Sequence, residues 1–245
     1  MYVLFLKELN SFLSSLIGYI TIIVFLVVIG LLLWVFPMEF NILDFGFAGI
    51  DGLFMLAPWV FLFLIPAITM KMFAEEKKNG TIELLLTKPI KDLSIILAKF
   101  FAGLSLVLFS VLPTIIYVVA VYQLGAPKGN LDLGGIIGSY FGLLFLGGVF
   151  VAIGVFSSSI TNNQIIAFII SVIVSAFAYI GFDVITGLGL FGNADLIIKS
   201  IGINSHYVSM ARGVIDTRDV IYYLSAIVFF LLLTKISLES RNWKK

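Results

Sequence analysis

The longest stretch of this chain without an acidic or basic residue runs for 50 residues, from Leu133 to Phe182. One continuous helix of that length would measure about 75 Å at 1.5 Å per residue. The hydrocarbon core of a bilayer is only ~30 Å thick. The polar segment Ser157 to Gln164 lies near the middle of the stretch, so the sequence predicts two membrane-spanning helices that are joined there.

Other apolar stretches repeat this pattern along the chain. Only 12% of the residues are charged, about half the share that is usual in a soluble domain. The sequence therefore predicts an all-α polytopic membrane protein, with one transmembrane domain over residues 1–245. Six spanning helices are expected, at about residues 16–36, 52–71, 93–123, 134–156, 164–186 and 219–238.

Two further segments are expected at the membrane surface. Met1 to Ser15 places a few polar residues among large apolar ones, which is typical of an interfacial amphipathic helix. A second interpretation is that this segment extends the first span. Between the fifth and sixth spans, Gly187 to Asp219 mixes short apolar pieces with seven charged or histidine residues. We expect short helices there, at or dipping into the outer interface.

A polar loop separates the second and third predicted spans. It runs from Phe73 to Asp92 and holds eight of the 29 charged residues of the chain. Gly80 permits a turn, Thr81 can cap a helix, Glu83 suits the positive end of its dipole, and Pro89 disfavours its continuation. The short helix between them carries three consecutive leucines, Leu84, Leu85 and Leu86. Because so short a helix is marginal in water, its leucines need the membrane face or a soluble partner to dock on.

The distribution of basic residues predicts the orientation of the chain. With six spans, both termini and the polar loop lie on one side, together with eleven of the fifteen lysines and arginines. Basic residues concentrate in cytoplasmic loops. The termini and the polar loop are therefore expected in the cytosol.

Glycine recurs at every fourth position near the start of the fourth predicted span, at Gly134, Gly138 and Gly142. Small residues at this spacing let helix backbones approach closely. One interpretation is a tight helix contact that slides during transport, and the other is ordinary helix packing.

The sequence offers little for catalysis, metal binding or cofactor binding, and we expect none of the three in this chain. It has no G-x-x-x-x-G-K-[ST] phosphate-binding loop, no cysteine and a single histidine, His206, which we expect to be a surface or hydrogen-bonding residue. Glu75-Glu76 resembles the glutamate pair of some intramembrane proteases, but no second histidine supports a metal. Asp183 either marks the outer end of the fifth span or is a functional carboxylate. The net charge of +1 argues against nucleic acid as a partner.

Two motifs resemble a known family. The segment F-A-E-E-K-K-N-G-T-I-E-L-L-L-T-K-P, residues 73–89, is similar to the cytoplasmic loop of ABC-2 type transporter permeases. The segment R-G-V-I-D-T-R-D-V-I-Y-Y-L-S, residues 212–225, resembles the start of the last span in that family. Together they look most like the permeases associated with bacterial gliding motility.

The resemblance implies a division of labour between subunits. Gly80 to Pro89 would be a coupling helix that docks into a separate ATPase subunit, which binds ATP and magnesium itself. Four neighbouring side chains would make polar contacts with it: Glu75, Glu76, Lys77 and Lys78. The interfacial helix would also touch the ATPase.

The resemblance also implies an assembly and an activity. Two permease chains, identical or paralogous, would form the pathway in the lipid of the bacterial inner membrane. They would export an unknown amphiphilic or polymeric substrate. Two alternatives stay open: a mechanical subunit that passes ATPase motion to envelope partners without moving a substrate, and an intramembrane enzyme, for which no catalytic constellation is found.

Overall fold

The computed structural model of the chain describes residues 1–44, 46–82, 91–189 and 192–240. Its regular elements are helices, with no strand in these ranges. Five of the described helices are long and apolar enough to cross a membrane, and the pair α1 and α2, bent by 63°, adds a sixth crossing if it counts as one span. The predicted all-helical, multi-pass fold is confirmed.

The first half of the chain contributes two of the central helices and a short polar one. Its elements are α1 (Tyr2–Leu13), α2 (Leu16–Trp34), α3 (Asp51–Thr69), α4 (Ala74–Lys78), α6 (Asp92–Val111), the 3-10 turn η1 (Leu112–Thr114) and α7 (Ile115–Leu124). The bend between α1 and α2 has a local cause. The Ser15 hydroxyl caps α2 by accepting a hydrogen bond from the Gly18 amide at 3.3 Å. A side chain at Gly18 would collide with the Phe12 carbonyl oxygen, 2.2 Å from where its Cβ would lie.

The second half contributes the longest helix and a group of short ones. Its elements are α8 (Leu133–Ile160), α9 (Gln164–Ala176), the π-helical turn η2 (Phe177–Gly181), α10 (Phe182–Gly187), η3 (Gly192–Ala194), α11 (Asp195–Ile201), α12 (Ile203–Met210) and α13 (Thr217–Glu239). The long uncharged stretch is divided at Thr161 to Asn163, and the three serines before it belong to α8. Pro113 lies in η1 and interrupts the α-helix between α6 and α7.

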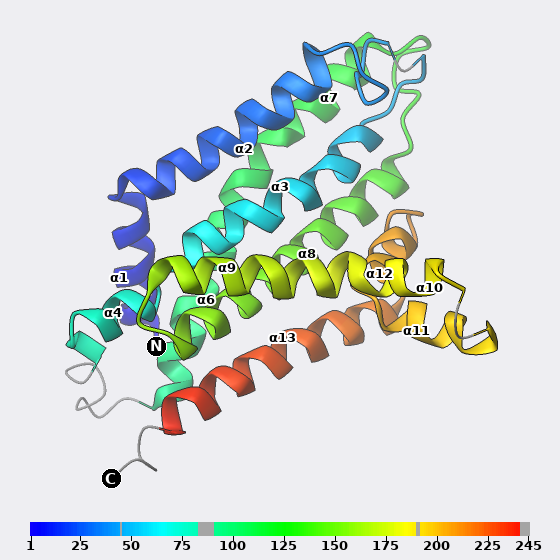
Figure 1. The fold of residues 1–245 in the computed structure, drawn as a ribbon. Coiled ribbons are helices and arrows are strands. Elements are labelled where there is room, and N and C mark those ends of the chain that lie inside the picture. Colours follow the sequence, from blue (N-terminus) through cyan, green and yellow to red (C-terminus); the bar gives the residue numbers. More distant parts are fainter. Residues whose placement is uncertain (45, 83–90, 190–191, 241–245) are drawn as a thin grey trace.

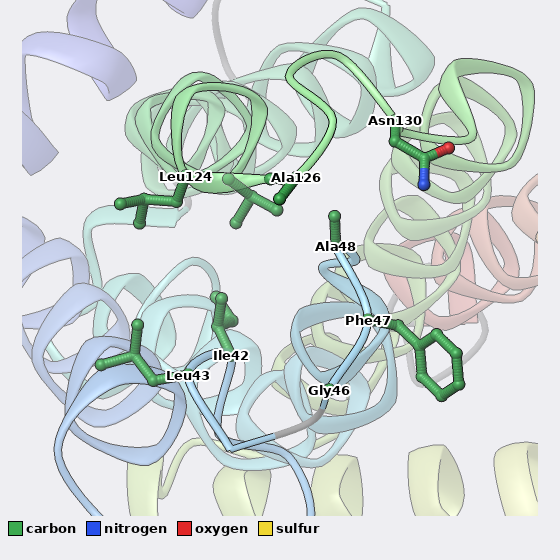
Figure 2. Close-up of a pocket in the computed structure, with 10 residues that line it drawn as sticks. Ile42, Leu43, Gly46, Phe47, Ala48, Leu124, Ala126 and Asn130 are labelled. Atoms are coloured by element: carbon green, nitrogen blue, oxygen red, sulfur yellow. The ribbon is translucent and has the colours of Figure 1, made fainter.

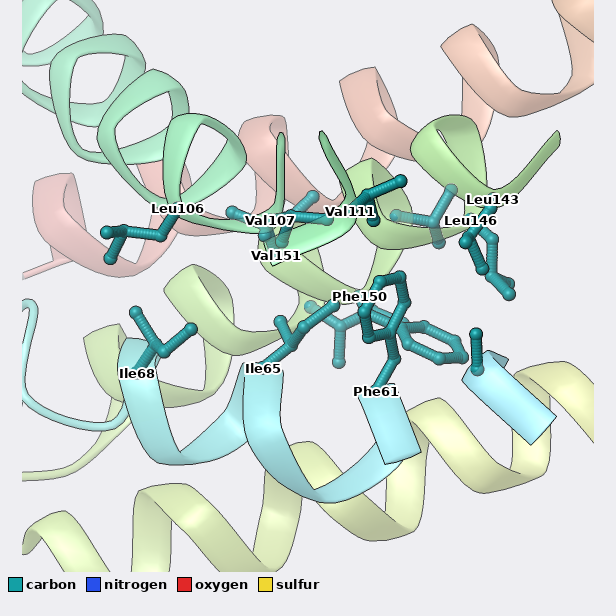
Figure 3. Packing of buried hydrophobic residues seen from close by; sticks show 14 of the residues in the cluster. Phe61, Ile65, Ile68, Leu106, Val107, Val111, Leu143, Leu146, Phe150 and Val151 are labelled. Atoms are coloured by element: carbon teal, nitrogen blue, oxygen red, sulfur yellow. The ribbon is translucent and has the colours of Figure 1, made fainter. Parts of the chain in front are cut away.

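Helix α8 forms the centre of the bundle. It packs against α3, α6, α9, α12 and α13, and it is more buried than any other spanning helix in the described part of the chain. Figure 3 shows the core around it, where α3 and α6 converge on one side of α8. The side chains that meet there include Phe61, Ile65, Ile68, Leu106, Val107, Val111, Leu143, Leu146, Phe150 and Val151.

The two ends of the bundle differ in what they hold (Figure 1). At one end, here called the terminal end, lie α1, α4, the start of α6, the turn between α8 and α9, and the end of α13. At the other, the distal end, lie the loop after α2, α7 and the short helices α10 to α12. The polar loop of the sequence therefore begins on the same side of the bundle as the first helix.

Candidate functional site

A single buried serine holds the chain where it leaves α3 for α4. The Ser158 hydroxyl, on α8, accepts hydrogen bonds from the amides of Phe73 at 2.7 Å and Ala74 at 3.1 Å. It also donates to the Met70 carbonyl at 3.3 Å. Backbone groups at a helix start need such partners when they are buried. Ser158 therefore fixes the base of the polar loop on the central helix.

A buried lysine ties the same region to the first helix. The Lys99 side chain, on α6, is only 2% exposed. Its ammonium lies 3.2 Å from Glu8 Oε2 on α1 and 2.9 Å from Glu76 Oε1 on α4, and 5.1 Å from the centre of the Phe73 ring. A buried charge is tolerated when it is paired in this way. Three helices are therefore joined through one side chain.

The end of α8 is held by two further side chains. The Lys77 ammonium donates to the Ser159 carbonyl, and the Ser237 hydroxyl on α13 donates to the same oxygen at 3.0 Å. This carbonyl lies in the last turn of α8, where no helical amide remains to bind it. A cation also suits the negative end of the helix dipole. We call this set of contacts, made by Glu8, Glu76, Lys77, Lys99, Ser158, Ser159 and Ser237, the polar junction.

The structure distributes the predicted polar-loop residues unequally. Glu76 belongs to the polar junction, and its second oxygen, Oε2, is buried without a hydrogen-bond partner in the described residues. Glu75 lines a cleft of about 510 Å³ between α1 and α4. Gly80 has a φ of +70°, which favours glycine, and the Thr81 hydroxyl donates to the Glu76 carbonyl at 3.4 Å. The remaining predicted residues, Glu83, Leu84, Leu85, Leu86 and Pro89, lie outside the described residues.

Of the seven members of the polar junction, sequence reasoning singled out only Glu76 and Lys77 as contact residues, and it overlooked the two that make most of the contacts, Lys99 and Ser158. Lys99 entered it only as one basic charge among eleven, and Ser158 only as part of a polar separator between two spans. A signal was present for Lys99, because it lies between Ile95 and Phe100 in an otherwise apolar segment. A lysine in such surroundings needs a carboxylate partner. The sequence does not say which carboxylate would be near.

The predicted glycine stripe lies at the distal end, against α12 and the turn that follows it. A Cβ on Gly138 would lie 2.2 Å from the Met210 carbonyl oxygen, and one on Gly142 would lie 3.3 Å from the Tyr207 ring. Gly134 is in contact with Gly213, because a Cβ on Gly213 would lie 2.9 Å from the Gly134 carbonyl carbon. The stripe therefore brings a short helix of the insert, rather than another span, close to α8.

A hydrogen bond from the insert completes the contact on α3. The Tyr207 hydroxyl donates to the Phe54 carbonyl at 2.8 Å. This carbonyl is free because Pro58, four residues on, has no amide hydrogen to offer it. Burial raises the pKa of the Tyr207 phenol well above its usual value of 10, so the donor keeps its proton at neutral pH.

The other predicted polar residues of this end make structural contacts. The two nitrogens of His206 lie 2.7 Å from Asp219 Oδ1 and 2.9 Å from the Ser200 carbonyl oxygen. Asp183 accepts a hydrogen bond from the Asn204 amide at 2.7 Å. No group of three or more metal-ligating side chains occurs within the described ranges.

A separate cavity of about 430 Å³ lies between two distal loops (Figure 2). Figure 2 shows Leu124 and Ala126, from the end of α7 and the loop after it, across the opening from Leu43 and Ala48. Asn130 is the one polar side chain among its lining residues. This cavity therefore offers no acid, base or nucleophile.

Comparison with models of protein families gives a match that covers most of the chain. Residues 49–238 match the family model described as ABC-2 family transporter protein. The matched range includes α3, the polar loop and every later spanning helix. A search of the curated proteins found no match.

Proposed function

Because this chain belongs to the ABC-2 family of transporter proteins, we propose that it is the permease subunit of a transporter driven by a separate ATPase subunit. The family match and the spanning helices support the membrane-embedded role. The ATPase must come from another chain, since the sequence has no phosphate-binding loop of the P-loop type.

The observation that carries the proposal is the polar junction around Lys99. A force applied to the polar loop reaches α4 first, and α4 is bound to α6 through Glu76 and Lys99. The same lysine holds α1 through Glu8, and Lys77 holds the end of α8. Movement of the loop would therefore be passed to α1, α6 and the central helix together, which is what coupling to an ATPase requires.

The orientation, the docking helix, the assembly and the direction of transport are proposed from the resemblance to ABC-2 permeases. The termini and the polar loop face the cytosol of a bacterial cell, and the helix within residues 80–89 docks on the ATPase. Two permease chains enclose the pathway in the inner membrane. The activity is export of an amphiphilic or polymeric substrate, and the link to gliding motility rests on the motif resemblance alone.

The coupling assignment can be tested with the intact complex. The permease is co-expressed with its cognate ATPase, purified and reconstituted in nanodiscs, and ATP hydrolysis is measured. Leu84→Asp or Leu85→Asp is expected to lower hydrolysis by the complex about 10-fold, because a carboxylate would replace a docking leucine. Leu43→Asp, an exposed leucine at the distal end, is the matched control and should leave hydrolysis unchanged. A fully active Leu84→Asp complex would show that this helix does not couple the subunits.

A second candidate function is favoured by the way the insert is anchored. Tyr207 binds α3, the glycine stripe holds α12 on α8, and His206 contacts α13 through Asp219. Motion of three spans would therefore reach the distal surface, as a force-transmitting subunit requires. ATP-dependent movement of a cargo into reconstituted vesicles would speak against this function and for transport.

A further inference from the structure

A second cavity opens at the surface of the bundle, at the distal end and away from the polar junction, with Met55, Trp59 and Val208 exposed on its walls. It has a volume of about 460 Å³ and is bounded by α3, α8, η2 and α12. Its walls are mainly apolar and include Phe54, Met55 and Trp59, with the Trp59 ring edge-on to Tyr179 at 6.1 Å. Apolar cavities of this size with a few polar groups are the usual form of a small-molecule site.

Two of the polar groups in this cavity lack a partner. Several serine hydroxyls inside these spans donate to the carbonyl four residues earlier, as Ser110 and Ser157 do at 2.9 and 2.8 Å, whereas Ser171 and Ser175 on α9 are sealed in without a partner among the described residues. Ser139 is 4% exposed and Tyr179 is 6% exposed, and the hydroxyl of neither has a hydrogen-bond partner within the ranges described. Neither oxygen is among the fully buried unpaired atoms of the described residues, so both hydroxyls can be reached from the cavity. Both groups line the cavity, so a ligand there could satisfy them.

The backbone around Tyr179 is also unusual. Residues Phe177 to Gly181 form a π-helical turn between α9 and α10. Such turns inside α-helices are frequently found at functional sites. From the other side, Asn204 on α12 is held by Asp183 through one amide hydrogen bond, and it too lines the cavity.

The charge of the lining limits what the cavity can accept. Among the described residues that line it, Asp51 is the one charged side chain, and none is a lysine, arginine or histidine. A negative ligand would therefore meet a carboxylate with no cation to offset it. An uncharged or positive group with hydroxyl or amine donors would find acceptors at Ser139, Tyr179 and Asp51.

We infer that this cavity binds the head of an uncharged or cationic amphiphile that carries hydroxyl or amine groups. Ser139 and Tyr179 bind the polar groups, and Trp59 packs against the apolar part. This inference rests on the proposed transport function and names the class of substrate that the permease would recognise.

Trp59 offers a direct test. The chain has three tryptophans, so Trp34→Phe/Trp243→Phe leaves Trp59 as the only tryptophan, which is excited at the red edge of its absorption, where tyrosine does not absorb. Three amphiphiles with the same decyl chain are titrated against this variant in nanodiscs: decyl maltoside, decylammonium and decyl sulfate. We expect a saturable change in Trp59 emission with the first two, and at least ~10-fold weaker binding of the sulfate.

Variants test the hydroxyls. In the same background, Ser139→Val or Tyr179→Phe should weaken binding of decyl maltoside about 10-fold, the loss of one hydrogen bond. Ser105→Val and Tyr19→Phe are matched controls outside the cavity and should leave the affinity unchanged. Tyr179→Phe removes a single oxygen, so it also tests the site if Ser139→Val fails to fold.

Three results would overturn the inference: no saturable signal, sulfate binding as tight as maltoside, or equal losses in the control variants, which would mean partition into lipid. The outcome is separable from the coupling test. If no amphiphile binds but Leu84→Asp still lowers ATP hydrolysis, the cavity is not a binding site and the ATPase coupling stands. If amphiphiles bind but Leu84→Asp has no effect on hydrolysis, the binding site stands and the coupling assignment is wrong.

Discussion

At the scale of single residues, Lys99 places a positive charge in the protein interior, because only 2% of its side chain is exposed to solvent. Two carboxylates compensate it, Glu8 and Glu76, and Glu8 also lies 3.7 Å from the exposed ammonium of Lys7. The large penalty for breaking a buried pair comes from the charges that stay behind. Removing the lysine therefore leaves two carboxylates facing each other.

We predict that Lys99→Met lowers the free energy of unfolding by about 3–5 kcal/mol. The measurement is unfolding in SDS, followed by circular dichroism. Lys235→Met is the control, because Lys235 pairs with Glu239 at 3.5 Å on the exposed end of α13, and such pairs contribute less than ~1 kcal/mol. An equal decrease in the free energy of unfolding in the two variants would mean that the buried ion pairs of Lys99 stabilise the protein no more than an exposed pair does.

The bond from Tyr207 to the Phe54 carbonyl leads to a second prediction. Tyr207→Phe should destabilise the protein by about 1–3 kcal/mol, because it leaves a buried acceptor unpaired. In a Pro58→Ala background a new amide can bind that carbonyl within α3, so the same change should cost less. A double-mutant cycle by SDS unfolding measures the difference. An equal cost in both backgrounds would contradict the role given to Pro58.

At the scale of helices, the contact between α8 and α12 depends on the absence of side chains at chosen positions. The Met210 carbonyl oxygen lies where a Cβ of residue 138 would be, whereas a Cβ on Gly134 would only approach Asp132 Oδ1 at 3.4 Å. The two glycines share a helix and a spacing motif but differ in how closely they are approached.

We therefore predict opposite effects of the same substitution. Gly138→Ala should destabilise the protein by about 1–3 kcal/mol through overpacking. Gly134→Ala should be neutral or slightly stabilising, since alanine favours a helix over glycine by up to ~1 kcal/mol. Thermal unfolding in detergent compares them, and faster amide hydrogen exchange in α12 should accompany the first variant only. Exchange that is unchanged in Gly138→Ala would show that α12 is held by other contacts.

The same contact marks how far sequence reasoning reaches. The spacing of Gly134, Gly138 and Gly142 predicted a close approach, but periodicity describes one helix and cannot identify the partner that approaches it. Likewise, Pro58 tells that the Phe54 carbonyl is free, whereas only the fold brings Tyr207 to it. The local sequence therefore shows which group lacks a partner within its own helix. Which residue becomes that partner depends on tertiary packing.

At the scale of the molecule, apolar length and the scarcity of charge were enough to predict an all-helical, multi-pass fold. The central place of α8 could not be predicted from its apolar character, because the span that begins with α9 is similarly apolar. Glu76 was predicted to contact the ATPase, and that remains a prediction. Its bond to Lys99 was not predicted, because the two residues are 23 positions apart in the chain.

The proposed orientation of the chain in the membrane can be tested by cysteine labelling. It contains no cysteine, so single cysteines can be added without other changes. With the terminal end in the cytosol, Leu196→Cys on α11 should react with a membrane-impermeant maleimide in intact spheroplasts. Asn79→Cys after α4 should react only after permeabilisation. The reverse pattern would place the polar loop outside and remove the basis for ATPase docking.

The central position of α8 bears on how the protein is made. A ribosome delivers helices in chain order, so α2, α3 and α6 enter the bilayer before the helix that α3 and α6 pack on has been synthesised. During that interval the turn into α4 has no Ser158, and Lys99 has only the carboxylates already translated. Those two ion pairs join segments that all precede α8, so they are available to hold the early helices together until translation supplies the core.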